Sequence, residues 1–222
     1  MGLFTPFANI KNNPTIVTDG LMMWVDAGNP ASYPGTGTTW TDLSGNGRNL
    51  TLVNGPVFNG ALNGGALVFD GTNDQLSSVS LANPNGRLTF QILFNYTAKN
   101  AYQNIFDRTL ANPMMWIDGS NRFEFNQAAL VSTLAYNGQN ILATGTFSTA
   151  TPGLQLYIND SLVRTTTGAQ ASWPNPFTVT LFNRGGLQTL QANVYSMRAY
   201  NKVLSADEIL QNYQYDSQRF NY

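Results

Sequence analysis

Short runs in which apolar and polar residues alternate constrain the fold of this chain more than any other feature. The run LTFQILFNY places five apolar side chains on one side, namely Leu88, Phe90, Ile92, Phe94 and Tyr96. A period of two residues is typical of half-buried β-strands. Clusters of glycine, asparagine and proline separate this run from similar ones at residues 66–69, 122–126, 154–159, 177–181 and 193–200. Their spacing, about 10 to 15 residues, predicts an all-β sandwich of antiparallel sheets.

One short helix is predicted near the C-terminus, within VLSADEILQNY. Ser205 can accept a hydrogen bond from the Glu208 amide while the Glu208 side chain reaches back to the Ser205 amide. Ile209 and Tyr213 are four residues apart and therefore share one face of such a helix. We expect the helix over residues 205–213, where it covers the sandwich and has no chemical role.

The composition excludes several classes of function. Histidine and cysteine are absent, which rules out Ser-His-Asp and Cys-His catalysis and zinc sites built from these residues. Only 10% of the residues are charged and the formal net charge is −1, so we expect binding to neither nucleic acid nor a membrane. The N-terminus lacks the basic and apolar segments of a secretory signal, and synthesis in the cytoplasm is expected.

Residues 1–18 show no periodic pattern and are predicted to form an extended arm in front of one domain, residues 19–222. The arm contains five large apolar residues, Leu3, Phe4, Phe7, Ile10 and Ile16. A solitary sandwich would leave these side chains in water, whereas strand addition to a neighbouring chain would bury them. We therefore expect the first four to bind another subunit, either a copy of the same chain or a different protein.

Four segments follow one another in a specific order along the chain. They are GLMMWVDAGNPASYPGTGTTWTDLSGNGRNLTL, GGALVFDGTNDQL, LQLYIND and ANVYSMRAYNKVLSADEILQNY. From about Gly20 to Tyr213, this order resembles a laminin-G-like jelly roll of the concanavalin A-like lectin/glucanase superfamily, which is related to the pentraxins. The first segment is similar to domains in structural proteins of tailed bacteriophages.

The resemblance implies a non-enzymatic structural protein of a virion, made in the host cytoplasm. It would decorate the capsid or belong to the tail or a fibre, and its lectin-like domain would face outward. Its partners would be other virion proteins, copies of itself and surface glycans. One alternative is a glycan-binding adhesin that attaches to host or environmental polysaccharide. A second is a glycan hydrolase.

Calcium is the cofactor that the resemblance most often implies, at two loops equivalent to AKNAYQNIFD and FNRGGLQTLQAN. The second loop offers neutral amides beside Arg184 and no carboxylate, which does not suit calcium. Weak ligand candidates are Asp70, Asn73, Asp74, Gln103 and Asn104. A turn in which Asp and Asn bind their own backbone explains DGTND better than a metal does. We expect no metal and no cofactor.

Two aromatic residues in proline-rich loops, Tyr33 and Trp173, are candidates for stacking against a sugar. Either ring could instead anchor its loop to the core. Hydrolysis of a glycan would need two carboxylates about 5 to 10 Å apart across the scissile bond. The two glutamates of the chain, Glu124 and Glu208, lie in segments without a glucanase motif. The sequence therefore favours binding over catalysis.

Overall fold

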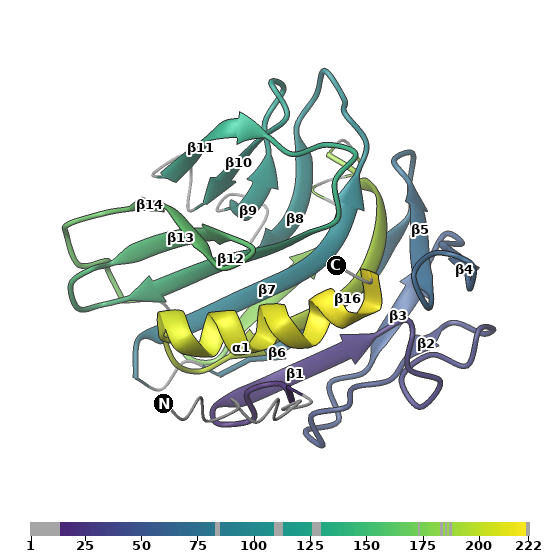
Figure 1. The fold of residues 1–222 in the computed structure, drawn as a ribbon, viewed down its shortest axis with the longest axis horizontal. Helices are drawn as coiled ribbons and strands as arrows, with labels where there is room; N and C mark the ends of the chain where they lie inside the picture. Colours follow the sequence, from purple (N-terminus) through teal and green to yellow (C-terminus); the bar gives the residue numbers. More distant parts are fainter. Residues whose placement is uncertain are drawn as a thin grey trace, which may run out of the picture.

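The chain folds as a β-sandwich of two eight-stranded sheets (Figure 1), which confirms the all-β expectation. The computed structural model describes residues 14–82, 85–108, 113–125, 130–172, 174–182, 184, 186 and 188–220. Every strand pair in these ranges is antiparallel. The same ranges contain no helix with the length and apolarity that a membrane span requires.

The first sheet has β16 near its middle. In spatial order its strands are β14 (Ser161–Thr165), β13 (Leu154–Ile158), β12 (Ile141–Ser148), β7 (Arg87–Tyr96), β16 (Gln191–Tyr200), β5 (Ala66–Asp70) and β4 (Val57–Asn59), with β1 (Leu21–Asp26) also paired to β16. One edge of β16 is shared, because its first half pairs with β5 and its second half with β1. The other edge pairs with β7.

The second sheet packs against the first. In spatial order its strands are β11 (Leu130–Ala135), β10 (Arg122–Phe125), β9 (Pro113–Ile117), β8 (Gln103–Asp107), β15 (Phe177–Leu181), β6 (Gln75–Leu81), β3 (Leu50–Val53) and β2 (Thr39–Trp40). The alternate apolar residues of β7 face the core as predicted. Phe90, Ile92 and Phe94 all lie in the main core and are at most 1% exposed. Burial of each such side chain contributes about 1.5 to 3 kcal/mol.

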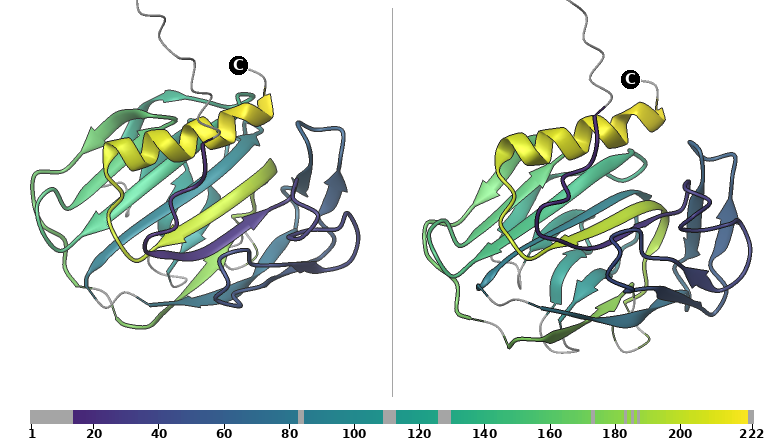
Figure 2. Two further views of the ribbon diagram at one scale, coloured as in Figure 1. Left: turned by 60° about the horizontal axis from the view of Figure 1, so that its bottom comes forward. Right: turned by 90° about the horizontal axis from the view of Figure 1, so that it is seen from below.

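Helix α1 (Ala206–Ser217), followed by the short 3-10 helix η1 (Gln218–Phe220), lies on the outer face of the first sheet (Figures 1 and 2). The predicted cap is confirmed: Ser205 Oγ accepts from the Glu208 amide at 3.2 Å and Glu208 Oε2 accepts from the Ser205 amide at 2.9 Å. The helix continues one turn beyond the predicted end at residue 213. Its last turn contains the buried Asp216, which an apolar pattern does not reveal.

Asp216 binds Arg198 of β16 through two hydrogen bonds of 2.6 and 2.7 Å. The Arg198 guanidinium also lies 5.9 Å from the Trp24 ring and 5.6 Å from the Tyr215 ring, so two aromatic rings border the charge. Nearby, Asn212 Nδ2 donates to Gln91 Oε1 and to the Tyr200 hydroxyl at 2.8 and 3.0 Å. Polar side chains therefore make much of the contact between helix and sheet.

Residues 14–18 of the expected arm pack against their own domain. Ile16 and Val17 are each 6% exposed, so the expectation that Ile16 would be left in water is wrong. The Val17 amide donates to Asn212 Oδ1 at 2.8 Å, and Gln211 Nε2 donates to the Thr15 carbonyl at 2.7 Å. The proposed partner-binding residues Leu3, Phe4, Phe7 and Ile10 lie outside the described residues.

We predict that Asp216→Asn lowers the free energy of unfolding by about 3 to 5 kcal/mol, because it leaves the buried Arg198 charge uncompensated. Urea denaturation measures the loss. Asp207→Asn on the exposed side of the same helix is the matched control and should cost at most about 1 kcal/mol, the size of a helix-dipole effect. Equal costs for the two variants would show that the ion pair does not hold the helix.

Candidate functional site

The weak metal-ligand candidates come together at one rim of the sandwich. Asp70 is paired with Gln191 at the junction of β5 and β16. The Gln191 amide donates to Gln103 Oε1 at 2.8 Å, and the Asn104 amide donates to the Gln188 carbonyl at 3.2 Å. The loops that precede β6, β8 and β16 therefore meet at this rim.

One carboxylate oxygen of Asp70 and one of Asp74 accept hydrogen bonds from backbone amides of the DGTND turn itself. Asp70 Oδ1 accepts from the Thr72 amide at 2.7 Å, and this bond lowers the pKa of Asp70. Asp74 Oδ2 accepts from the Asp70 amide at 3.0 Å, while burial raises the pKa of Asp74. Asn73 is exposed. In the described ranges, no three acidic side chains form a group that could hold a metal ion.

The ammonium group of Lys99 lies at this rim. Its Nζ lies 2.9 Å from the Gly71 carbonyl oxygen and 3.5 Å from the Thr189 carbonyl oxygen. Both amide atoms of Asn104 are buried without a hydrogen-bond partner. One neutral amide beside an ammonium does not make the set of six to eight oxygens that calcium takes. The rim therefore does not fit the implied ion, and Lys99 was missed because no local sequence pattern marks it.

The two glutamates do not form a catalytic pair. Glu124 lies on β10 of the second sheet, where burial raises its pKa and the hydrogen bond donated by the Trp116 indole opposes this rise. Glu208 belongs to the cap of α1, on the outer face of the first sheet. Because they stand on different sheets, they do not flank one glycosidic bond in the way that hydrolysis requires.

The candidate stacking residue Tyr33 anchors its loop. It is 4% exposed, its hydroxyl donates to the Gly37 carbonyl at 2.8 Å, and its ring centroid lies 5.5 Å from that of Phe58. The ring therefore has no open face for a sugar. Trp173 lies outside the described residues. Tyr102 is 48% exposed and was not singled out from the sequence.

An open cleft of about 440 Å³ lies beside the middle of α1, and we call it the amide cleft. It is lined by Gly138, Gln139, Asn140, Asn159 and Tyr213. The first three residues precede β12, Asn159 follows β13, and Tyr213 is contributed by the helix. The lining contains no charged side chain.

Several amide groups of this cleft keep unused donors. Asn140 Oδ1 accepts from Asn95 Nδ2 and from the Tyr195 hydroxyl, both at 3.1 Å, and Asn159 Oδ1 accepts from the Leu142 amide at 3.0 Å. These bonds fix the orientation of both side chains. Their Nδ2 groups donate to no acceptor in the described part of the chain, and the exposed Gln139 side chain makes no hydrogen bond there. The cleft therefore offers hydrogen bonds to a neutral polar ligand.

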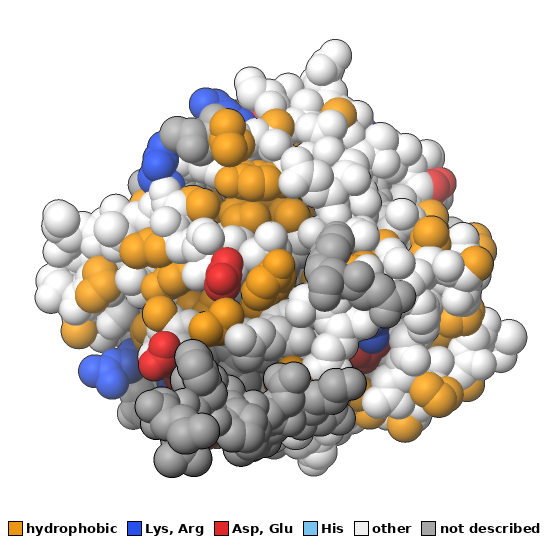
Figure 3. Space-filling model, viewed as in Figure 1, with side chains coloured by type: hydrophobic (Ala, Val, Ile, Leu, Met, Phe, Trp, Pro, Cys, Tyr) orange, Lys and Arg blue, Asp and Glu red, His pale blue; other side chains and the backbone are white. Residues whose placement is uncertain are grey.

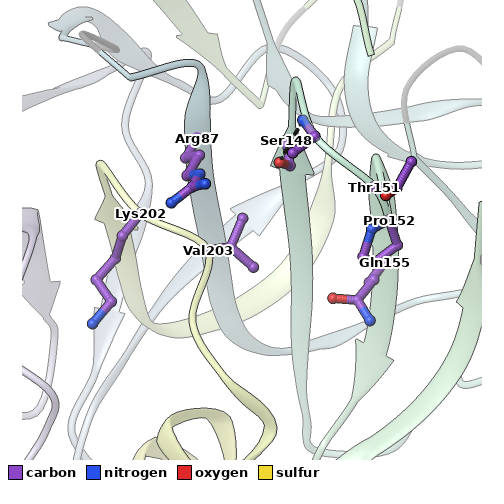
Figure 4. A pocket seen from close by; sticks show the side chains of 8 residues that line it. Arg87, Ser148, Thr151, Pro152, Gln155, Lys202 and Val203 are labelled. Carbon is purple, nitrogen blue, oxygen red and sulfur yellow. Dashed lines mark hydrogen bonds between the residues drawn. The ribbon is translucent and has the colours of Figure 1, made fainter. Parts of the chain in front are cut away.

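A second open cleft, of about 300 Å³, lies at the other end of β12, and we call it the arginine cleft. Figure 4 shows Arg87, Lys202 and Val203 on one side of it and Ser148, Thr151, Pro152 and Gln155 on the other. Ala150 completes the lining.

The loop that follows β16 reaches the arginine cleft because one hydroxyl holds it. Thr89 Oγ1 donates to the Lys202 carbonyl at 2.7 Å and accepts from the Leu204 amide at 3.0 Å. The Lys202 ammonium bonds to Asp19 Oδ2 and to Glu208 Oε1, each at 2.7 Å. In Figure 4 the Lys202 side chain extends away from the residues on the opposite side of the cleft.

Two packed antiparallel sheets with surface clefts and a covering helix define a lectin-like jelly roll. The sequence model of a family described as the concanavalin A-like lectin/glucanases superfamily matches residues 69–210. This is more than half of the chain, and the chain belongs to that family. No curated protein sequence matches it.

Solved structures show the same fold at low sequence identity. The Trypanosoma rangeli sialidase in complex with the inhibitor DANA is 14% identical with a TM-score of 0.69, over 92% of this chain and 34% of that one. The receptor-binding domain of botulinum neurotoxin C/D mosaic serotype is 12% identical with a TM-score of 0.65, over 89% of this chain and 52% of that one. The chain thus spans about a third and about half of these proteins, and the likeness concerns the fold alone.

We predict that Lys99→Met lowers the free energy of unfolding by about 1 to 3 kcal/mol, because the Gly71 carbonyl loses a charged hydrogen-bond donor. Thermal unfolding with added calcium and with a chelator is the accompanying measurement. The melting temperature of the unmodified protein should not change in either condition, because the rim already contains a cation. A fall of many degrees on chelation would reveal a structural metal ion and contradict this assignment.

Proposed function

We propose that this chain is a non-enzymatic carbohydrate-binding module and that the amide cleft receives the sugar. The observation that carries the proposal is the combination of one aromatic ring with three amide side chains in a single open cleft. The membership of the chain in a lectin-like family supports it. The separation of Glu124 and Glu208 onto different sheets supports binding without hydrolysis.

The chemistry of the cleft matches that of a neutral sugar. A sugar presents hydroxyl groups, which accept and donate hydrogen bonds, and patches of C–H groups, which pack on the face of an aromatic ring. The amides of Gln139, Asn140 and Asn159 can bind the hydroxyls, and the Tyr213 ring can contact an apolar patch. Pockets with a few fixed polar groups beside an aromatic side chain are typical of small-molecule sites. Charged side chains are sparse on the visible face that carries α1 (Figure 3), which suits an uncharged ligand.

Tyr213→Ala and Gln139→Ala should each weaken binding of a neutral oligosaccharide selected on a glycan array. We expect a loss of about 5-fold or more, because each change removes roughly 1 kcal/mol of contact. Isothermal titration measures the affinity, and a melting curve checks that each variant is folded. Gln139 is exposed, so its replacement should leave the fold intact.

Tyr102→Ala is the matched control, because it removes an exposed tyrosine that directly precedes β8 of the second sheet. It should leave binding unchanged. If Tyr102→Ala abolishes binding and Tyr213→Ala does not, the sugar binds on the second sheet and the amide cleft is not the site. If no glycan binds to the unmodified protein, the carbohydrate-binding proposal fails.

We also propose, as a second function, that residues 1–13 attach the domain to other virion proteins or to copies of itself. The support is that residues 14–17 pack on α1. The apolar residues Leu3, Phe4, Phe7 and Ile10 precede this packed segment in the sequence. In this proposal the protein decorates a capsid or belongs to a tail or fibre.

Deletion of residues 2–13 tests the attachment while it keeps the segment that packs on the helix. The shortened protein should keep its melting temperature and lose incorporation into particles, which quantitative mass spectrometry of purified virions measures. Full occupancy of the shortened protein would contradict the attachment role. The deletion leaves the amide cleft untouched, so sugar binding should persist in either case.

A further inference from the structure

The first sheet carries a row of asparagines that begins at the amide cleft. Asn140 lines the cleft and directly precedes β12, Asn95 lies on the adjacent β7, and Asn193 lies on β16 beyond it. The register of the sheet pairs Asn95 with Asn193. Asn95 Nδ2 donates to Asn140 Oδ1 at 3.1 Å, so the row is continuous with the cleft. We call these three residues the asparagine row.

The asparagine row lies on the outer face of the sheet. Phe94 and Val194, which are the sequence neighbours of Asn95 and Asn193, are both fully buried in the main core. Successive side chains of a strand point to opposite faces, so the asparagines point away from the core. All three are half-buried, and part of each residue therefore reaches the surface. In Figure 1 the end of β7 and the start of β16 extend beyond α1, which leaves this part of the face uncovered by the helix.

The row keeps hydrogen-bonding groups that no described residue uses. The Asn193 side chain makes no hydrogen bond in the described part of the chain, so its oxygen and both its N–H groups are unused there. Asn95 gives one N–H group to Asn140, and its oxygen accepts no hydrogen bond from a described residue. The row thus adds acceptors to the donors that the amide cleft presents.

Groups that donate and accept side by side match a ligand that carries hydroxyls, because a hydroxyl also does both. Neither the row nor the cleft lining contains a charged side chain, so an ionised ligand would find no opposite charge there. Adjacent strands lie about 4.8 Å apart, and the row therefore extends about 10 Å from Asn140 to Asn193. A single sugar beside Tyr213 and Gln139 does not reach Asn193, whereas a chain of sugars does.

We propose that the amide cleft and the asparagine row form one extended site for several consecutive units of a linear, uncharged polysaccharide. The inference rests on the proposed function, because it takes the cleft as the first part of the site. One unit contacts Tyr213 and Gln139, and the following units lie across β7 and β16 with Asn193 as the furthest contact. The site then selects a chain of sugars over a single sugar.

Linear neutral oligosaccharides of one composition, from the disaccharide to the hexasaccharide, test the inference. A glycan array with the unmodified chain chooses the composition, and isothermal titration with the full chain measures the affinity at each length. The affinity should rise about 5-fold or more from the disaccharide to the hexasaccharide, because the longer probe gains the hydrogen bonds of the row. A longer probe also has more ways to bind, but this statistical gain is equal for the unmodified protein and a variant.

Asn193→Ala should weaken binding of the hexasaccharide by about 5-fold and leave the disaccharide unaffected. The replacement breaks no hydrogen bond among the described residues, so the fold should persist, which a melting curve checks. Gln214→Ala is the matched control, because it removes an exposed amide of α1 that does not line the amide cleft. It should change neither affinity.

Three outcomes would overturn the inference while the proposed function stands. The hexasaccharide could bind no more tightly than the disaccharide, Asn193→Ala could leave its affinity unchanged, or Gln214→Ala could weaken it equally. In each case a loss of disaccharide binding in Tyr213→Ala still supports the amide cleft. If Asn193→Ala weakens binding and Tyr213→Ala does not, the sugar binds on the row alone and both proposals are wrong. Absence of binding at every length contradicts both as well.

Discussion

The buried ion pair between Arg198 and Asp216 is the interaction on which the helix-covered face of this protein depends. Arg198 lies in β16, the strand that pairs with β7, β5 and β1, and Asp216 lies in the last turn of α1. The two side chains are 1% and 2% exposed, so neither charge has water to compensate it. Burial alone would lower the pKa of Arg198, but the adjacent Asp216 carboxylate raises it above its ordinary value, so the guanidinium stays charged. The middle strand of the sheet thereby fixes where the helix ends.

The position of the helix in turn forms one wall of the amide cleft. The face of a sheet alone is a gently twisted surface that forms no cleft, whereas a helix packed on that face supplies one side of a cleft. Tyr213 is carried to the wall of the amide cleft between the cap at Ser205 and the ion pair at Asp216, which hold the two ends of the helix. The loop that enters the helix contributes Lys202 and Val203 to the arginine cleft. The helix and the loop that leads into it therefore border two clefts with different linings.

The fold was predictable from the sequence because strands and the helix cap are local. The side chains of β7 alternate between core and outer face, and the Ser205–Glu208 cap lies within four residues, so both are visible in a short window. The end of the helix was not predictable, because Asp216 is buried by a residue 18 positions away in the sequence. Likewise, no residue next to Lys99 in the sequence indicates that its ammonium group will bind the Gly71 carbonyl. The two residues lie in separate loops, which only the topology of the sheets brings together. The Tyr213 ring was expected on the helix, but its place beside three turn amides required the three-dimensional structure.

The contrast between the rim and the clefts shows why a list of polar residues does not by itself locate a site. At the rim, the oxygens of Asp70, Asp74 and Gln103 each accept an internal hydrogen bond, and the cation among them is a side chain of the same protein. Such groups hold loops together and have little capacity for a ligand. In the amide cleft the oxygens of Asn140 and Asn159 are also occupied, yet these bonds orient the two amides and leave their Nδ2 groups without an acceptor in the described part of the chain. A side chain that binds a ligand needs one hydrogen bond that fixes its orientation and a second hydrogen-bonding group that is unused. Among the described residues, the amides beside the helix combine these two features, whereas the carboxylates of the rim do not.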